Sequence, residues 1–187
     1  MIQKTTPFIR RAIVADAGLL TELGARTFRE AFAADNKPED MAAYMAVAFS
    51  PEKQAAELGD PRGMFLVAEI DGVAIGYAKL STGDAPVCVG GSDPIELARL
   101  YVSQEWIGRG VGKALMRECI DEARRAGCQT MWLGVWEHNP RAQAFYRKWG
   151  FHVVGEHVFQ LGSDFQTDLL MERALREVEV ASAGGSE

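Results

Sequence analysis

A glycine-rich turn at residues 108–112 constrains the fold of this chain more than any other feature. It follows an apolar, strand-like stretch and opens an amphipathic helix. Gly108, Gly110 and Gly112 leave no Cβ where an anion would approach the backbone. The amides of the first helical turn would face that anion with the positive end of the helix dipole. This order of elements is typical of a phosphate site, although a turn that only caps a helix would also satisfy it.

Two nucleotide-binding motifs share this layout, and the turn matches neither of them. A P-loop requires Gly-x-x-x-x-Gly-Lys-Ser/Thr, but Ile107 occupies the position of its first glycine and Ala114 that of its magnesium-binding hydroxyl. A dinucleotide fingerprint, Gly-x-Gly-x-x-Gly, has its third glycine one residue later than Gly112 and lies near the start of a domain. A nucleotide-binding module is therefore kept only as an alternative.

Length and charge predict one soluble globular domain. The 187 residues are 48% hydrophobic and 25% charged, enough for one good core and too few for two large ones. We expect a single domain over residues 1–187, with an ordered core at 7–174 and a tail at 175–187. The net charge of −6 argues against a nucleic-acid partner and weakly favours cationic substrates.

The cysteines and the hydropathy pattern predict a cytoplasmic protein. Cys88, Cys119 and Cys128 are odd in number and scattered, which suits a reducing compartment, and they lack the spacing of a metal site. The chain contains no apolar run of membrane-spanning length and no signal peptide. We therefore expect no membrane association and no metal.

Hydrophobic periodicity and turn residues predict an alternation of strands and helices. Asp16 stands where a helix N-cap is expected, Ser50 and Pro51 where the second helix would stop, and Gly127 where a left-handed cap would end a later helix. In chain order the predicted elements are a strand at 8–14, helices at 16–32 and 38–49, strands at 64–70, 73–81 and 95–102, a helix at 110–126, a strand at 130–135, a helix at 139–149, and strands at 151–160 and 168–173.

Two motifs give residues 7–174 a resemblance to a known family. The first is Gly-Arg-Gly-Val-Gly-Lys at 108–113, and the second is Asn-Pro-Arg-Ala-Gln-Ala-Phe-Tyr-Arg-Lys-Trp-Gly-Phe at 139–151. They are similar to the pyrophosphate loop, Arg/Gln-x-x-Gly-x-Gly/Ala, and to the Asn…Ala…Phe-Tyr-x-Lys-x-Gly-Phe signature of the GNAT superfamily of acyl-CoA N-acyltransferases. Ile107 departs from the Arg or Gln that usually opens the loop, and Arg109 is a candidate to replace that contact.

The resemblance implies an α+β fold, an αβα sandwich. Its sheet is mixed and mainly antiparallel, with about seven strands and helices on both faces. The strand at 95–102 would splay from the strand at 130–135, often at a β-bulge, and a pantetheine arm would lie in the gap. Backbone groups of Leu100, Tyr101 and Val102 would bind that arm as an added strand does.

The resemblance also implies an enzyme. It would transfer the acetyl group of acetyl-CoA to a primary amine by direct attack in a ternary complex, with the Val102 amide stabilising the oxyanion. Tyr146 would protonate the departing thiolate, unless it is only a buried aromatic beside Phe145. Asn139 would be a polar ligand of acetyl-CoA, a helix N-cap, or both. The implied binding residues are Leu100, Tyr101, Val102, Gly108, Arg109, Gly110, Val111, Gly112, Lys113, Asn139 and Tyr146.

The same family resemblance implies that Glu96, near the start of the strand at 95–102, is the general base. Relatives that acetylate protein N-termini often carry a base where this chain has Gly134, which argues against that subgroup. Glu137 and His138 are nearby reserves, although such residues are more often solvated loop residues.

Only a second resemblance indicates which chemical class of amine is the acceptor. Residues 155–168 look like the C-terminal region of bacterial spermidine/spermine acetyltransferases, which implies a small-molecule amine, here a polyamine. Glu30, Asp35 and Asp164 could surround a polycation, and Phe28 and Phe32 could line its site, although such a helix stripe is usually core. The rival function is a CoA-binding regulatory or sensor protein with little turnover. Edge strands near the C-terminus leave both a monomer and a homodimer open.

Overall fold

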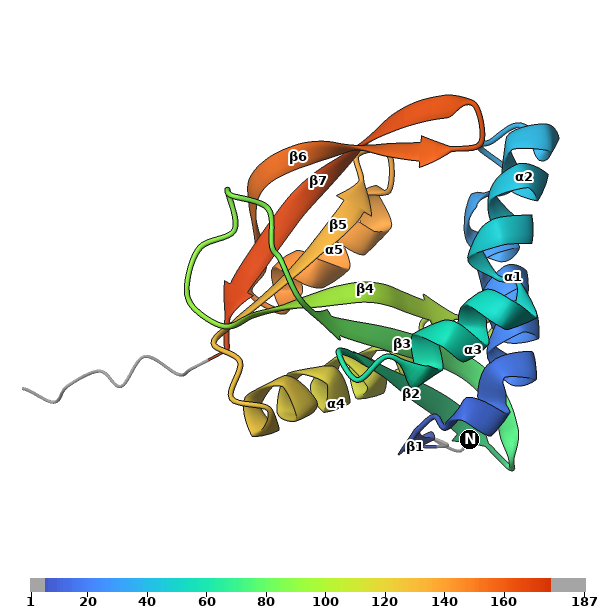
Figure 1. Ribbon diagram of the computed structural model, residues 1–187, viewed down its shortest axis with the longest axis horizontal. Helices are drawn as coiled ribbons and strands as arrows, with labels where there is room; N and C mark the ends of the chain where they lie inside the picture. The colour runs from blue at the N-terminus through green and yellow to red at the C-terminus, as the bar shows by residue number, and fades with distance from the viewer. Residues whose placement is uncertain (1–5, 176–187) are drawn as a thin grey trace, which may run out of the picture.

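The computed structural model describes residues 6–175 and arranges seven strands in one sheet (Figure 1). The strand order is β1-β2-β3-β4-β5-β7-β6, and every neighbouring pair is antiparallel except β4 with β5. This mixed, mainly antiparallel sheet confirms the predicted fold class. The strands are β1 (Phe8–Arg11), β2 (Gly63–Ile70), β3 (Val73–Thr82), β4 (Pro94–Val102), β5 (Thr130–Trp136), β6 (His152–Leu161) and β7 (Asp164–Ala174).

Helices cover both faces of the sheet (Figure 1). On one face α4 packs on β1 to β4, and aromatic residues of α5 join the same core cluster. On the other face α1 contacts β3 and α3 contacts β2. None of the helices between residues 6 and 175 is long and apolar enough to cross a membrane. The helices are α1 (Ala17–Phe32), α2 (Pro38–Ala48), α3 (Pro51–Gly59), α4 (Val111–Arg125) and α5 (Pro140–Lys148), with 3-10 turns η1 (Val14–Asp16) and η2 (Gln104–Trp106).

The two central strands separate soon after they pair. β4 and β5 run parallel for three residue pairs, the last of which joins Glu96 to Trp132. Just beyond this point β4 carries a bulge, because Leu97 and Arg99 pair with consecutive residues of β3 and leave Ala98 extra. The strands then diverge (Figure 1), as the family resemblance predicted.

The structure corrects two predicted boundaries. Pro51 does not end the helical region but opens α3, since Ser50 caps this helix by accepting a hydrogen bond from the Lys53 amide at 3.1 Å. β7 begins at Asp164 rather than at residue 168, because a tight turn with Gly162 at φ +60° follows β6 directly.

Of the two helix caps predicted at Asp16 and Gly127, the structure confirms the one that ends α4 but not a side-chain cap at the start of α1. The Asp16 side chain does not cap α1; it accepts hydrogen bonds from the Ile13 amide and from Arg10, and β1 ends at Arg11. The left-handed end of α4 at Gly127, with φ +81°, is confirmed. The predicted tail lies outside the described residues from position 176 onward.

Candidate active site

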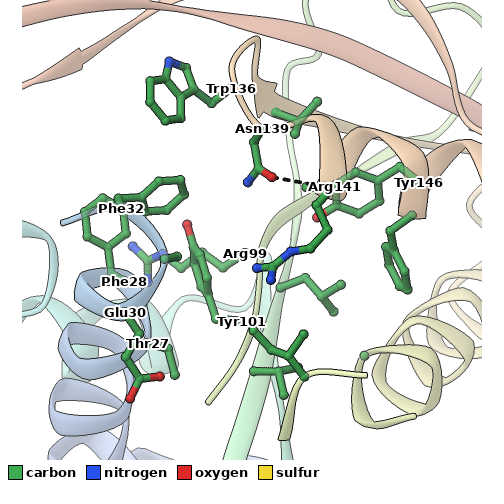
Figure 2. Close-up of a pocket in the computed structure, with 18 of the residues that line it drawn as sticks. Thr27, Phe28, Glu30, Phe32, Arg99, Tyr101, Trp136, Asn139, Arg141 and Tyr146 are labelled. Carbon is green, nitrogen blue, oxygen red and sulfur yellow. Dashed lines mark hydrogen bonds between the residues drawn. The ribbon is translucent and has the colours of Figure 1, made fainter. Parts of the chain in front are cut away.

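The gap between β4 and β5 opens into a cavity of about 940 Å³ with two distinct halves (Figure 2). We call the part formed by the glycine turn and α5 the turn half. It is lined by Trp106, Ile107, Gly108, Arg109, Gly110, Gly112, Lys113, Asn139, Arg141, Ala142, Phe145 and Tyr146. We call the remainder, which lies toward α1 and the β6–β7 hairpin, the aromatic half. Its walls include Phe28, Glu30, Phe32, Tyr44, Phe49, Arg99, Tyr101, Trp136, Phe159, Gln166 and Asp168.

Main-chain geometry defines the turn half. Gly108 and Gly110 adopt φ values of +81° and +93°, which side chains rarely tolerate, and Gly110 is the N-cap of α4. The first amides of α4 have no partner within the helix, so they are available to an anion. A Cβ built at Gly112 would meet Phe145 and Val102 only at 3.9 Å, which is ordinary van der Waals contact.

Basic side chains add positive charge to these amides. Arg109, Lys113 and Arg141 all line the turn half, and the Arg109 guanidinium lies 5.1 Å from the centre of the Trp106 ring. Ile107 lines it too and is 40% exposed, so an apolar side chain stands where the family usually has Arg or Gln. The free amides and three cations fit a diphosphate of the kind that acetyl-CoA carries.

The predicted cofactor-binding residues come together here with one exception. Leu100, Tyr101 and Val102 line the middle of the cavity, where β4 has left β5. The exception is Val111, which is buried in the core at the start of α4 and does not line the cavity. Its side chain packs inward, so only its backbone amide belongs to the exposed helix end.

Asn139 lines the cavity and caps a helix. Its Oδ1 accepts a hydrogen bond from the Ala142 amide at 3.1 Å at the start of α5 (Figure 2). The predicted N-cap role is therefore confirmed. The amide nitrogen of the same side chain points toward the cavity (Figure 2).

Tyr146 lies on α5 among aromatic rings. Its ring centre is 5.5 Å from that of Phe145 and 5.8 Å from that of Phe151, and the residue lines the turn half. Burial raises the pKa of its hydroxyl well above the usual value. The hydroxyl is protonated at neutral pH, as an ordinary tyrosine hydroxyl also is, so it carries a proton that it can donate.

Aromatic side chains from distant segments form the other half. Phe28 of α1 stacks on Tyr44 of α2 with ring centres 4.9 Å apart, and Tyr44 meets Phe159 of β6 at 5.4 Å. Phe32 of α1 meets Trp136 of β5 edge to face with ring centres 6.2 Å apart. Phe28 is buried in this cluster and also lines the cavity.

A buried ion network lies under the aromatic half. Arg99 donates to the Glu57 carboxylate at 2.8 and 3.3 Å, and the Lys79 amine lies 3.1 Å from the same group. Although burial alone would raise the pKa of Glu57, the two cations hold it below its usual value. Among these three residues only Arg99 lines the cavity, together with the carboxylates of Glu30 and Asp168.

Glu96, the predicted base, lies outside the cavity lining. It belongs to the last pair of residues that still joins β4 to β5, so the gap opens only beyond it. Burial raises the pKa of its carboxyl, against the opposing charges of Lys79, His157 and Arg99. Glu137 and His138 lie in the turn after β5 and do not line the cavity either.

Sequence reasoning missed several lining residues. Arg141 stands inside the second motif and could have been found from its position in the first turn of α5. Trp136, Arg99 and Asp168 carry no local motif. Their place at the cavity depends on the β4 bulge and on the register of the β6–β7 hairpin, which the sequence alone does not reveal.

Comparisons with known proteins place this fold and cavity in one family. The model of the acetyltransferase (GNAT) family matches residues 25–151. An uncharacterized N-acetyltransferase of Lactobacillus delbrueckii subsp. lactis is 37% identical over 82% of this chain and 88% of its own length. Another from Mycobacterium tuberculosis is 36% identical over 87% of this chain and 99% of its own. The chain belongs to the GNAT acetyltransferase family and is an N-acetyltransferase.

Solved structures agree with this assignment. The PaiA N-acetyltransferase of Thermoplasma acidophilum, solved in complex with coenzyme A, superposes with a TM-score of 0.70 over 90% of this chain and 99% of its own, at 23% identity. The yncA protein of Salmonella typhimurium, solved with its cofactor acetyl-CoA, has a TM-score of 0.62 and 27% identity over 95% of this chain and 99% of its own. The fold is thus that of GNAT acetyltransferases.

Proposed function

We propose that this protein is a cytoplasmic enzyme that transfers the acetyl group of acetyl-CoA to a primary amine by direct attack in a ternary complex. One observation carries the proposal: a single cavity connects the free amides of α4 with the aromatic half, and Tyr146 is among the residues that line it. The coenzyme bound in the Thermoplasma and Salmonella structures supports the choice of acetyl-CoA. The three cysteines are free thiols, as in a reducing compartment.

Each region of the cavity has a role in this proposal. The amides of Gly110, Val111 and Gly112 and the nearby cations hold the diphosphate. The pantetheine arm runs along the backbone of residues 100–102 as an added strand would, and the Val102 amide stabilises the oxyanion. Tyr146 gives its proton to the departing sulfur, which is consistent with a hydroxyl that stays protonated at neutral pH.

The acceptor site is the aromatic half. Glu30, Asp168 and Arg99 are its charged lining residues, a balance that suits an acceptor ammonium. A polyamine such as spermidine or spermine stays our prediction for the acceptor, and the two carboxylates support it. Asp35 and Asp164, which the sequence offered as further contacts, do not line the cavity.

The deciding experiment measures thiol release from acetyl-CoA with a panel of amines. The panel contains spermidine, spermine, a monoamine with an aliphatic chain and one with an aromatic ring, and mass spectrometry identifies the acetylated product. We expect release that requires an amine, and faster release with the polyamines. Tight coenzyme binding without amine-dependent release would favour a regulatory CoA-binding protein. Competition by ATP or NAD at the coenzyme site would instead favour a nucleotide-binding module.

A further inference from the structure

A carboxylate and a histidine face each other beside the aromatic half. Asp168 of β7 is the cross-strand partner of His157 on β6, and the His157 Nε2 lies 3.7 Å from the Asp168 Oδ2. Both atoms lie over Gly134 of β5, where an added Cβ would be 3.3 Å from each of them. The missing side chain at Gly134 therefore makes room for this pair.

The pair runs from the cavity to the solvent. Asp168 lines the cavity and its side chain is only 15% exposed, whereas the His157 side chain is 44% exposed and does not line it. Burial raises the pKa of the Asp168 carboxyl, while His157 opposes the rise. Two other titratable groups are coupled electrostatically to the pair: the charge of Asp168 raises the pKa of Tyr44 on α2, and the charge of His157 lowers that of Glu96 on β4.

We propose that Asp168 binds the acceptor ammonium and takes its proton, and that His157 positions this carboxylate and passes the proton to solvent. The inference rests on the proposed function, because it needs an amine in the aromatic half. Asp168 is preferred to Glu96 as the base because it lines the cavity, whereas Glu96 lies where β4 and β5 are still paired. It is preferred to Glu30 because the Glu30 carboxylate already accepts a hydrogen bond from the Gln104 amide at 2.8 Å.

The proton count closes with these groups. The ammonium gives one proton to Asp168, which passes it through His157 to solvent and is again a carboxylate. The neutral nitrogen then forms a bond with the thioester carbon, the carbon–sulfur bond breaks, and the sulfur takes a proton from Tyr146. The nitrogen loses its second proton to Asp168, which again passes it through His157 to solvent and returns to the carboxylate, and Tyr146 recovers a proton from solvent. The products are an N-acetyl amide and the free thiol of coenzyme A.

The same two strands supply a matched control. Glu172 of β7 is the cross-strand partner of His152 on β6, again with 3.7 Å between the two groups and with a carboxylate side chain 16% exposed. This second pair lies outside the cavity lining, and Glu172 accepts a hydrogen bond from the Gly90 amide at 2.5 Å. Glu172→Gln therefore changes a similar carboxylate without touching the acceptor site.

The test compares Asp168→Asn, Glu172→Gln and Glu96→Gln, with spermidine and phenethylamine as acceptors and acetyl-CoA binding measured in parallel. Asp168→Asn should lower kcat/KM by about 100-fold at neutral pH and leave the affinity for acetyl-CoA unchanged. This loss of kcat/KM should shrink as the pH approaches the pKa of the acceptor ammonium in solution, because a larger fraction of the acceptor is then already neutral. Glu172→Gln should change the rate by less than about twofold. A loss that is uniform across pH, or a larger low-pH loss in Glu96→Gln, would overturn the proposal.

A second variant covers the case in which Asp168→Asn does not fold. His157→Ala should lower the rate by about tenfold, with the deficit greatest at low pH, and imidazole in the buffer should restore part of it. An unchanged pH profile without rescue would overturn the positioning role. If the unmodified protein released no thiol with any amine, the proposed function itself would fail; an active protein with a fully active Asp168→Asn variant would refute this inference alone.

Discussion

The two halves of the cavity are built in different ways. The turn half comes mainly from two short segments, residues 106–113 and 139–146, and its binding groups are largely main-chain amides at a helix end. The aromatic half comes from side chains on α1, α2, β4, β5, β6 and β7. Local sequence determines the first kind of site, whereas the second exists only after distant elements have packed together.

The interactions that hold the two halves in place also differ: long-range side-chain contacts hold the aromatic half, and local backbone conformation holds the turn half. Side-chain hydrogen bonds connect the α1–α2 region to the β6–β7 hairpin beside the aromatic half: Asp40 accepts from the Ser163 amide at 2.6 Å and from its hydroxyl at 2.8 Å, and Gln166 donates to Asn36 at 2.5 Å. The turn half depends on backbone conformation at Gly108 and Gly110. Changes in the turn half should therefore affect acetyl-CoA, and changes in the aromatic half the acceptor.

The largest effect is expected from Gly112→Asp in the turn half. Its Cβ would make only ordinary contacts at 3.9 Å, so the fold should tolerate it, but the carboxylate would stand where we place the diphosphate. We expect the affinity for acetyl-CoA to fall by about 1,000-fold, because two like charges brought together cost several kcal/mol. Isothermal titration calorimetry measures this, with Gly112→Ala as the control. Equal losses in both variants would mean that space, and not charge, governs the site.

Tyr146→Phe should separate chemistry from binding in the turn half. The ring keeps its packing against Phe145 and Phe151, so acetyl-CoA should bind as before. We expect kcat to fall by about 50-fold, below the typical effect of a general acid, because a thiolate can leave without full protonation. Stopped-flow measurement of thiol release gives this number. A normal kcat would leave Tyr146 as a packing residue only.

Which predicted residues line the cavity follows the same division. The predicted turn-half residues line the cavity apart from Val111, since a glycine turn and a capped helix carry their geometry locally. The β4 bulge at Ala98, which decides where the gap opens and leaves Glu96 outside the lining, depends on pairing with β3. Asp168 reaches the cavity through the register of the β6–β7 hairpin, which follows from the turn at Gly162.

The missed helix α3 has a different cause. Pro51 is compatible both with the end of one helix and with the first position of the next, and the residues on its two sides do not distinguish them. In the folded chain α3 places Glu57 against Arg99, a residue of the cavity wall. Tertiary packing therefore decides whether this proline ends one helix or begins the next, and α3 supports the aromatic half through the Glu57–Arg99 ion pair.

Phe159→Ala should impair the aromatic half selectively. The Phe159 ring meets Tyr44 at 5.4 Å and lines the cavity, so its loss removes one wall of the acceptor site. We expect the KM for the amine to rise about tenfold, equivalent to about 1.4 kcal/mol, with acetyl-CoA affinity unchanged. Phe165→Ala is the matched control, because this ring on β7 is 70% exposed and outside the cavity lining. A parallel fall in acetyl-CoA affinity would show that the two halves are not independent.

Substitution of Asn139 should have the smallest effect on acetyl-CoA binding. It tests whether this side chain only caps α5 or also binds the coenzyme. Asn139→Ala removes the cap that the Ala142 amide uses and should lower the free energy of unfolding by about 1 kcal/mol, whereas Asn139→Ser should restore most of it. If the amide nitrogen also contacts acetyl-CoA, both variants should bind it about fivefold more weakly, the effect of one hydrogen bond. Thermal unfolding and calorimetry measure the two quantities separately. A serine variant with normal affinity would make Asn139 a cap alone, and the turn half would then bind its ligand through main-chain amides and cations without this side chain.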